Sequence, residues 1–164
     1  MKVELKVTGL DGVLDMLKKL PPEIASKRGG PVRAALRKGA LVIHRQEKAN
    51  LQAIISGTTD NGEKLSTGLL MDNLIVSRGK APIGGKGERY LIRIKRKVYP
   101  RPNNEAGDTT TIKVARLLEY GSSKQPARSW IRAAAESKAQ EAVNVTTTEL
   151  LRRVNAIVKK LARK

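Results

Sequence analysis

The chain contains no phenylalanine and only one tryptophan, so its hydrophobic core has to be built from aliphatic side chains. Leu, Ile, Val and Ala must fill the interior, and the single indole, Trp130, is placed to pack where two elements meet. With 164 residues the chain is long enough to form such a core. We therefore predict one domain over residues 1–164.

Hydrophobic periodicity predicts two kinds of element, short strands and amphipathic helices. Pro31 suits the first turn of a long helix, because its missing N–H would have no partner there. The order of elements predicts an α+β fold, in which a small antiparallel sheet packs against two long helices and extended loops connect them. The expected elements are a strand over 1–8, a helix over 10–20, a long helix over 31–55, strands over 74–78 and 89–99, a short helix over 114–120 and a long helix over 128–163. The expected loops are 56–65, 80–88 and 100–111.

The segment that joins the last two helices carries the clearest local signals. Gly121 can adopt the positive φ that closes a helix, and Pro126 fixes the chain before the next helix. The simplest interpretation is a helix–turn–helix corner filled by Trp130. Thr67 is expected to cap a turn that leads into the strand over 74–78.

Few residues could perform catalysis. His44 is the only histidine, and no cysteine or second histidine could join it in a site. Glu119 is either a buried carboxylate beside Tyr120 or, more simply, an ion-pair partner of Arg128 or Arg132. The carboxylates form no close pair, so we expect no enzymatic activity, no cofactor and no metal. The glycine-rich residues 83–87 lack the Gly-Lys-Ser/Thr ending of a phosphate loop and are expected to form a hairpin tip.

The charge is strongly positive, with 33 Lys and Arg against 15 Asp and Glu, a net +18. Such a balance indicates contact with nucleic acid or with acidic protein partners. Residues 78–101 hold nine cations against one acid, Glu88, and form either a phosphate-contacting strand face or a solvated or subunit-facing one. Any DNA contact would be non-specific, because no sequence-reading signature is present. The candidates that would face DNA are Arg89, Arg93, Lys95, Lys97, Lys159, Lys160, Arg163 and Lys164.

Three absences narrow the expected setting. There are no cysteines, which excludes disulfides and thiolate metal sites. The first nine residues alternate in polarity instead of forming the apolar run of a signal peptide. No stretch approaches the ~18 apolar residues of a membrane span, so no membrane contact is expected.

Two segments resemble a known family. Residues 118–122 (Leu-Glu-Tyr-Gly-Ser), 126–128 (Pro-Ala-Arg) and 130–134 (Trp-Ile-Arg-Ala-Ala) are similar to the C-terminal signature of the tail-completion and head–tail joining proteins of lambdoid-type long-tailed phages. Residues 66–69 (Ser-Thr-Gly-Leu) and 72–74 (Asp-Asn-Leu) resemble an earlier step of the same family. The chain departs from it at Ser129 and Ala133, where members often have proline, and at Trp130, where phenylalanine is usual.

The resemblance implies a structural virion protein that forms a ring, six-fold by this analogy, at the head-proximal end of the tail. Its partners would be a tail-terminator or tail-tube protein on one side and neck proteins on the other, with phage DNA in the lumen. Assembly would take place in the host bacterial cytoplasm. An alternative from a different class is a basic cytoplasmic nucleic-acid-binding protein. The residues expected to form the structural or interface keystone are Thr67, Gly68, Leu69, Glu119, Tyr120, Gly121, Pro126, Arg128, Trp130 and Arg132.

Overall fold

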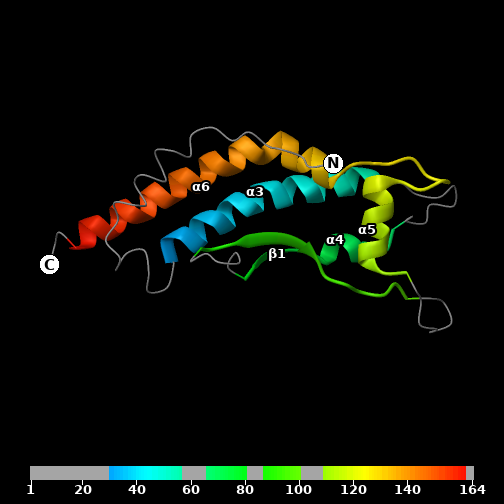
Figure 1. The fold of residues 1–164 in the computed structure, drawn as a ribbon, viewed down its shortest axis with the longest axis horizontal. Helices are drawn as coiled ribbons and strands as arrows, with labels where there is room; N and C mark the ends of the chain where they lie inside the picture. Colours follow the sequence, from blue (N-terminus) through cyan, green and yellow to red (C-terminus); the bar gives the residue numbers. More distant parts are fainter. Residues whose placement is uncertain (1–29, 57–65, 81–86, 101–108, 162–164) are drawn as a thin grey trace. The chain divides into compact units, whose positions relative to one another are not determined.

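The computed structural model describes residues 30–56, 66–80, 87–100 and 109–161, and it confirms the predicted α+β fold (Figure 1). A two-stranded antiparallel sheet accompanies two long helices and two short ones. The elements are α3 (Gly30–Ile55), α4 (Leu69–Asp72), β1 (Leu74–Arg78), β2 (Tyr90–Ile94), α5 (Thr111–Tyr120) and α6 (Ile131–Leu161). The expected strand over 1–8, the helix over 10–20, most of the three expected loops, and Arg163 and Lys164 lie outside the described residues.

The described chain forms two compact units, each built from separate stretches of sequence. The first unit contains described residues within 1–43, 76–91 and 137–164, and the second contains those within 44–75 and 92–136. The long helices and both strands contribute residues to each unit. The single-domain assignment therefore stays a prediction.

In the first unit, α3 and α6 pack side by side through small residues (Figure 1). Ala35 is buried with Leu150 and Val154, while Gly39, one turn later in α3, faces Thr146, one turn earlier in α6. This reversed pairing shows that the helices run antiparallel. The missing side chain of Gly39 is what permits the close approach of the two backbones at this point.

A buried glutamate on α6 joins the same two helices. The carboxylate of Glu149 accepts hydrogen bonds from Arg152 Nη2 at 2.8 Å, Lys38 Nζ at 2.7 Å and Arg153 Nε at 2.6 Å. The hydrogen bonds from Arg152 and Lys38 outweigh the effect of burial and hold the pKa of Glu149 well below its usual range. One carboxylate thus forms ion pairs with three cations at the helix–helix seam.

β1 and β2 form a hairpin, as expected. The amide of Gly79 donates to the carbonyl of Arg89 at 2.8 Å, which closes the pair beyond the strand ends. Glu88 accepts hydrogen bonds from Arg78 Nε at 2.8 Å and from Arg33 Nε of α3 at 2.7 Å. The one acid of the basic segment 78–101 therefore joins the hairpin to α3.

The second unit has an aliphatic core with one large ring in it. Leu51 of α3, Leu70 of α4, Leu74 of β1 and Ala115 of α5 pack around Trp130, which is fully buried. Four elements, α3, α4, β1 and α5, therefore converge on the indole. The prediction that Trp130 packs where elements meet is confirmed.

The predicted strand over 89–99 is too long, because β2 ends at Ile94. Its partner β1 begins at Leu74, and the last ladder bond joins the amide of Lys95 to the carbonyl of Asn73 at 2.9 Å. Beyond this point the side chain of Thr111 takes over, donating to the Lys95 carbonyl at 2.6 Å and accepting from the Lys97 amide at 3.0 Å. The alternation of apolar and polar residues continues in the sequence beyond Ile94, where β1 no longer provides a partner, and the prediction was therefore too long.

The predicted start of the last helix at residue 128 is also wrong, because α6 begins at Ile131. The amide of Arg128 donates to the carbonyl of Leu118 at 2.8 Å, which holds the chain against the end of α5. The carbonyl of Trp130 accepts from the amide of Ala134 at 3.3 Å and so makes the first bond of the helix. α6 then continues without a break through the β-branched residues 145–148.

Gly39→Ala is expected to destabilise the protein by about 1–3 kcal/mol, because the added Cβ would overlap Thr146 Oγ1 and the Ala142 carbonyl oxygen. The sign is informative, since alanine ordinarily stabilises a helix interior relative to glycine by about 1 kcal/mol. Gly30→Ala is the matched control, because nothing lies within 4 Å of a Cβ added there. Urea denaturation measures both, and stabilisation by Gly39→Ala would contradict the close helix approach.

Candidate functional site

The corner between α5 and α6 begins with a helix that is capped at both ends. The Thr110 side chain accepts a hydrogen bond from the Lys113 amide at 3.3 Å and so caps the start of α5. Gly121 ends the helix with φ of 76°, as the sequence predicts. A Cβ at Gly121 would lie 2.7 Å from the amide nitrogen of Ala127 and 2.8 Å from the carbonyl oxygen of Gln125. Both the backbone angle and the returning chain therefore require glycine.

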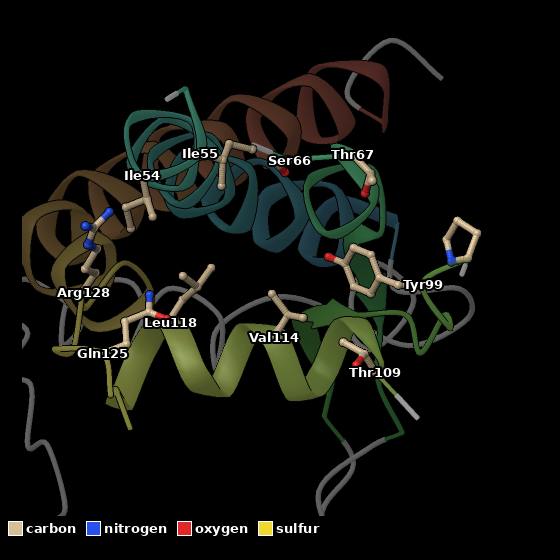
Figure 2. A pocket seen from close by; sticks show the side chains of 11 residues that line it. Ile54, Ile55, Ser66, Thr67, Tyr99, Thr109, Val114, Leu118, Gln125 and Arg128 are labelled. Carbon is tan, nitrogen blue, oxygen red and sulfur yellow. The ribbon is translucent and has the colours of Figure 1, made fainter. Parts of the chain in front are cut away.

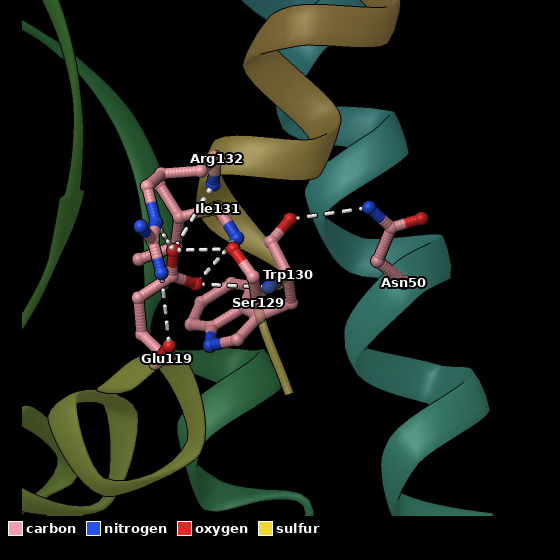
Figure 3. A network of polar contacts seen from close by, with 6 residues as sticks. All are labelled: Asn50, Glu119, Ser129, Trp130, Ile131 and Arg132. Atoms are coloured by element: carbon pink, nitrogen blue, oxygen red, sulfur yellow. Dashed lines mark hydrogen bonds and ion pairs between the residues drawn. The ribbon is translucent and has the colours of Figure 1, made fainter. Parts of the chain in front are cut away.

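The carboxylate of Glu119, at the end of α5, binds the start of α6 (Figure 3). Its Oε2 accepts hydrogen bonds from the backbone amides of Trp130 at 2.8 Å and Ile131 at 2.9 Å. Its Oε1 accepts from Ser129 Oγ at 2.8 Å and Arg132 Nε at 2.9 Å. The first amides of a helix have no partner within it and attract negative charge, so this carboxylate satisfies both requirements.

Both interpretations of Glu119 hold at once. The residue is 3% exposed, and it forms an ion pair with Arg132. Burial acts to raise the pKa of Glu119, but the bonds from the Ile131 amide, the Arg132 side chain and other donors outweigh it, and the pKa is lowered. Arg128 does not join this ion pair within the described structure; only its backbone takes part in the corner.

Trp130 connects this network to α3 through its backbone. Its carbonyl oxygen accepts a hydrogen bond from Asn50 Nδ2 at 3.1 Å (Figure 3). The indole Nε1 is buried and has no hydrogen-bond partner among the described residues. The ring is therefore held by packing, and the polar contacts of this residue are made by its main chain.

Glu47 is a site residue that the sequence did not reveal. It is 4% exposed on α3, and its Oε2 has no hydrogen-bond partner among the described residues. Burial first, and the negative charge of Glu119 second, raise the pKa of Glu47 to about 7. A signal was available, because Glu47 lies four residues before buried Leu51 and so shares its inward stripe.

The second signature segment lies in the same unit as the first. Ser66 Oγ accepts from the Gly68 amide at 3.2 Å and Thr67 Oγ1 accepts from the Leu69 amide at 3.4 Å, which shapes the turn before α4. Gly68 takes φ of 73°, and α4 then packs against α5. Leu70, the residue after this turn, is buried with Trp130. The two sequence segments thus share one core.

Two residues of the corner face outward. The Tyr120 side chain is 69% exposed, and the Arg132 guanidinium lies 5.4 Å from the centre of its ring. Because Glu119 holds Arg132 Nε, the cation is kept beside the ring. Tyr120 was expected to share the keystone role with Trp130, but the two aromatic residues point to different environments.

A pocket of about 480 Å³ lies on the side of α5 that carries Val114 and Leu118 (Figure 2). Val114 and Leu118 of α5 lie opposite Ile54 of α3 in this apolar lining, with Arg128 at one end and Tyr99 at the other (Figure 2). Pro126, two residues before Arg128, lies in the exposed part of the corner. This pocket could accept an apolar group of a ligand, with the Arg128 cation of the protein beside it.

The cations expected to face DNA are exposed wherever the structure describes them. Arg89 belongs to the first unit, as do Lys159 and Lys160 in the last turn of α6. The remaining described candidates belong to the second unit and are Arg93, Lys95 and Lys97. Three of the described candidates therefore belong to the first unit and three to the second.

His44 has a structural contact that explains its position. Its Nε2 donates a hydrogen bond to the carbonyl oxygen of Leu74 at 3.0 Å, because a carbonyl can only accept. The bond joins α3 to the first residue of β1. Across residues 30–56, 66–80, 87–100 and 109–161, no group of three or more His, Cys, Asp or Glu could hold a metal ion.

Comparison with known proteins leaves the family open. No protein-family model, no curated protein and no solved structure matches the chain. Among the described helices, none is both long and apolar enough to cross a membrane.

Trp130→Ala is expected to cost about 3–5 kcal/mol of unfolding free energy, because it empties the centre of an aliphatic core. Tyr120→Ala is the matched control: it removes a mostly exposed ring and is expected to cost about 1 kcal/mol or less. Chemical denaturation followed by far-UV circular dichroism measures both variants. Equal losses would contradict the distinct roles of the two aromatic residues.

Glu47→Gln is expected to change how stability depends on pH. Between pH 4.5 and about 7 the folded protein keeps the Glu47 proton while the unfolded chain releases it, so rising pH favours unfolding of the wild type. The variant should lack this fall and gain up to roughly 3 kcal/mol over the wild type at pH 8. Denaturation curves at several pH values test this, with the exposed Glu136→Gln as control. An unchanged difference from pH 4 to 8 would contradict a raised pKa.

Proposed function

We propose that this chain is a structural protein of a tailed-phage virion, which forms a ring at the head-proximal end of the tail, completes the tail and joins it to the neck. The observation that supports this is the convergence of the two signature segments. Residues 66–74 and 118–134 resemble two separated steps of tail-completion proteins, and both contribute to the core around Trp130. The residues of both segments pack in this core and fix the path of the backbone, as expected for a protein that joins two assemblies through its shape.

In this proposal the function is geometric. The Glu119 network fixes the direction in which the chain enters α6, because five donor groups converge on one buried carboxylate. A ring subunit needs such a fixed corner, since small angular errors accumulate around a closed symmetric assembly. The ring would contact a tail-terminator or tail-tube protein on one side and neck proteins on the other. Six-fold symmetry follows from the resemblance alone.

The exposed cations favour a second candidate, a nucleic-acid-binding protein that contacts phosphates without sequence preference. Lys95 and Lys97 are exposed and have no ion-pair partner among the described residues. In a neck ring the same cations would meet DNA in the lumen only weakly, because tight binding would hinder its passage. The strength of DNA binding and its response to salt therefore separate the two functions.

The purified protein is expected to form a closed ring, detected by multi-angle light scattering and negative-stain imaging, and to bind duplex DNA only weakly. The double variant Lys95→Glu/Lys97→Glu should keep the ring and lower the remaining DNA affinity, whereas Arg37→Glu on α3 is the single-site charge control. A monomer whose DNA affinity is high and falls steeply with salt would instead establish the second candidate. A ring that fails to form in the double variant would assign these cations to an interface.

A further inference from the structure

The side of α5 that points away from the core is partly apolar and mostly exposed. Thr111, Ala115 and Glu119 are buried on the inner side, at intervals of one turn. The opposite side, which we call the outer face of α5, contains Leu117 at 40% exposure and Tyr120 at 69% exposure. The outer face consists of Ile112, Lys113, Arg116, Leu117 and Tyr120. Large exposed apolar side chains next to one another indicate a contact surface.

The outer face is hollowed next to Tyr120. A hollow of about 450 Å³ is lined by Leu117, Lys113 and Gly121 with Tyr120. A second hollow of about 240 Å³ is lined by Ile94, Ile131 and Arg132, again with Tyr120. Both hollows also share Ile112 and Arg116. Two adjacent apolar hollows joined by one aromatic ring can accept two side chains of a single bound segment.

The charge on this surface has one sign. Lys113, Arg116 and Arg132 line the hollows, and the only acid among the lining residues is Glu119. Both oxygens of Glu119 are already bound to donors of residues 129–132. Within the described structure, Lys113 and Arg116 have no ion-pair partner. The surface therefore presents cations that a ligand carboxylate could meet.

We infer that the outer face of α5 binds an acidic segment of another protein, which inserts two apolar side chains beside Tyr120 and pairs carboxylates with Lys113 and Arg116. The cation held over the ring by Glu119 positions Tyr120 before the partner arrives, which lowers the entropic cost of binding. The inference concerns this surface alone and holds whether or not the chain is a virion protein.

Charge and ring geometry favour this occupant over two others. A second copy that used the same face would bring its own Lys113 and Arg116 against these two residues, so like charges would oppose that contact. Nucleic acid would meet the cations, but phosphates gain nothing from apolar hollows. The guanidinium of Arg132 also occupies a position over the Tyr120 ring where a base would stack.

The test uses fluorescein-labelled peptides of about 12 residues, longer than the roughly 15 Å of α5, and measures fluorescence anisotropy with the full chain. One peptide alternates Glu or Asp with Leu, the second replaces Leu by Ser, and the third replaces the acids by Lys. Only the acidic Leu peptide is expected to bind, with a Kd on the order of micromolar.

Two pairs of variants separate this surface from general effects. Leu117→Ser and Arg116→Glu should each weaken binding about tenfold, because each removes one of the two recognition elements. Val158→Ser, at 49% exposure, and Arg37→Glu are matched controls on other helices and should bind as the wild type does. Thermal melting verifies that each variant is folded. Agreement of all four variants with these expectations supports the inference.

Other results would overturn it. Equal binding of the Ser peptide would mean that charge alone is recognised. Failure of the acidic Leu peptide, together with duplex DNA binding that Arg116→Glu abolishes, would assign the surface to nucleic acid. Self-association of the purified chain that Leu117→Ser abolishes would assign it to a second copy.

Discussion

A single carboxylate connects three elements of the second unit. Glu119 is supplied by the end of α5, its oxygens bind the amides that begin α6, and Trp130 in turn accepts a bond from Asn50 of α3. Because the Trp130 amide is buried, water could not readily replace the carboxylate there, and an unpartnered buried donor costs about 1–3 kcal/mol. The position of the indole, and with it the aliphatic core, depends on this one side chain.

Three of the seven acidic residues that the structure describes are buried. Among the described residues, Glu47, Glu119 and Glu149 are all buried, and Glu88 is held by two arginines. Glu119 and Glu149 each hold the neighbouring helix by a cation, and only Glu47 lacks a partner for one oxygen. These three buried carboxylates do not contribute to the exposed surface of the described residues.

Local sequence signals predicted the elements whose limits are set locally. α3 after Pro31, β1 at 74–78 and the glycine that ends α5 all follow from periodicity or backbone preference. The start of α5 was expected at residue 114 but lies at Thr111, where the local cap by Thr110 sets it. The other two limits that were wrong depend on distant partners. The start of α6 is set by Glu119, eleven residues before Trp130, and the end of β2 is set by where β1 begins. The residue pattern within α6 or β2 alone does not identify either of these partners.

The same distinction applies to the site. Burial of Trp130 was predicted, and Arg132 was one of the two cations expected to pair with Glu119, because large rings and opposite charges have few alternatives in so short a segment. The exposure of Tyr120 and the burial of Glu47 were not, because each depends on how one element packs on another. From the sequence alone, an acid within an apolar helical stripe cannot be told from a solvent-exposed one, because its burial depends on residues of other elements.

The solitary indole also makes the protein its own spectroscopic reporter. Since Trp130 is the only tryptophan and lies wholly within the second unit, tryptophan emission observes that core and no other part of the chain. Far-UV circular dichroism is dominated instead by α3 and α6, the two longest described helices, which contribute residues to both units. Coincident transitions in the two signals would mean that both units melt as one cooperative body, and separated transitions would mean that each has its own stability.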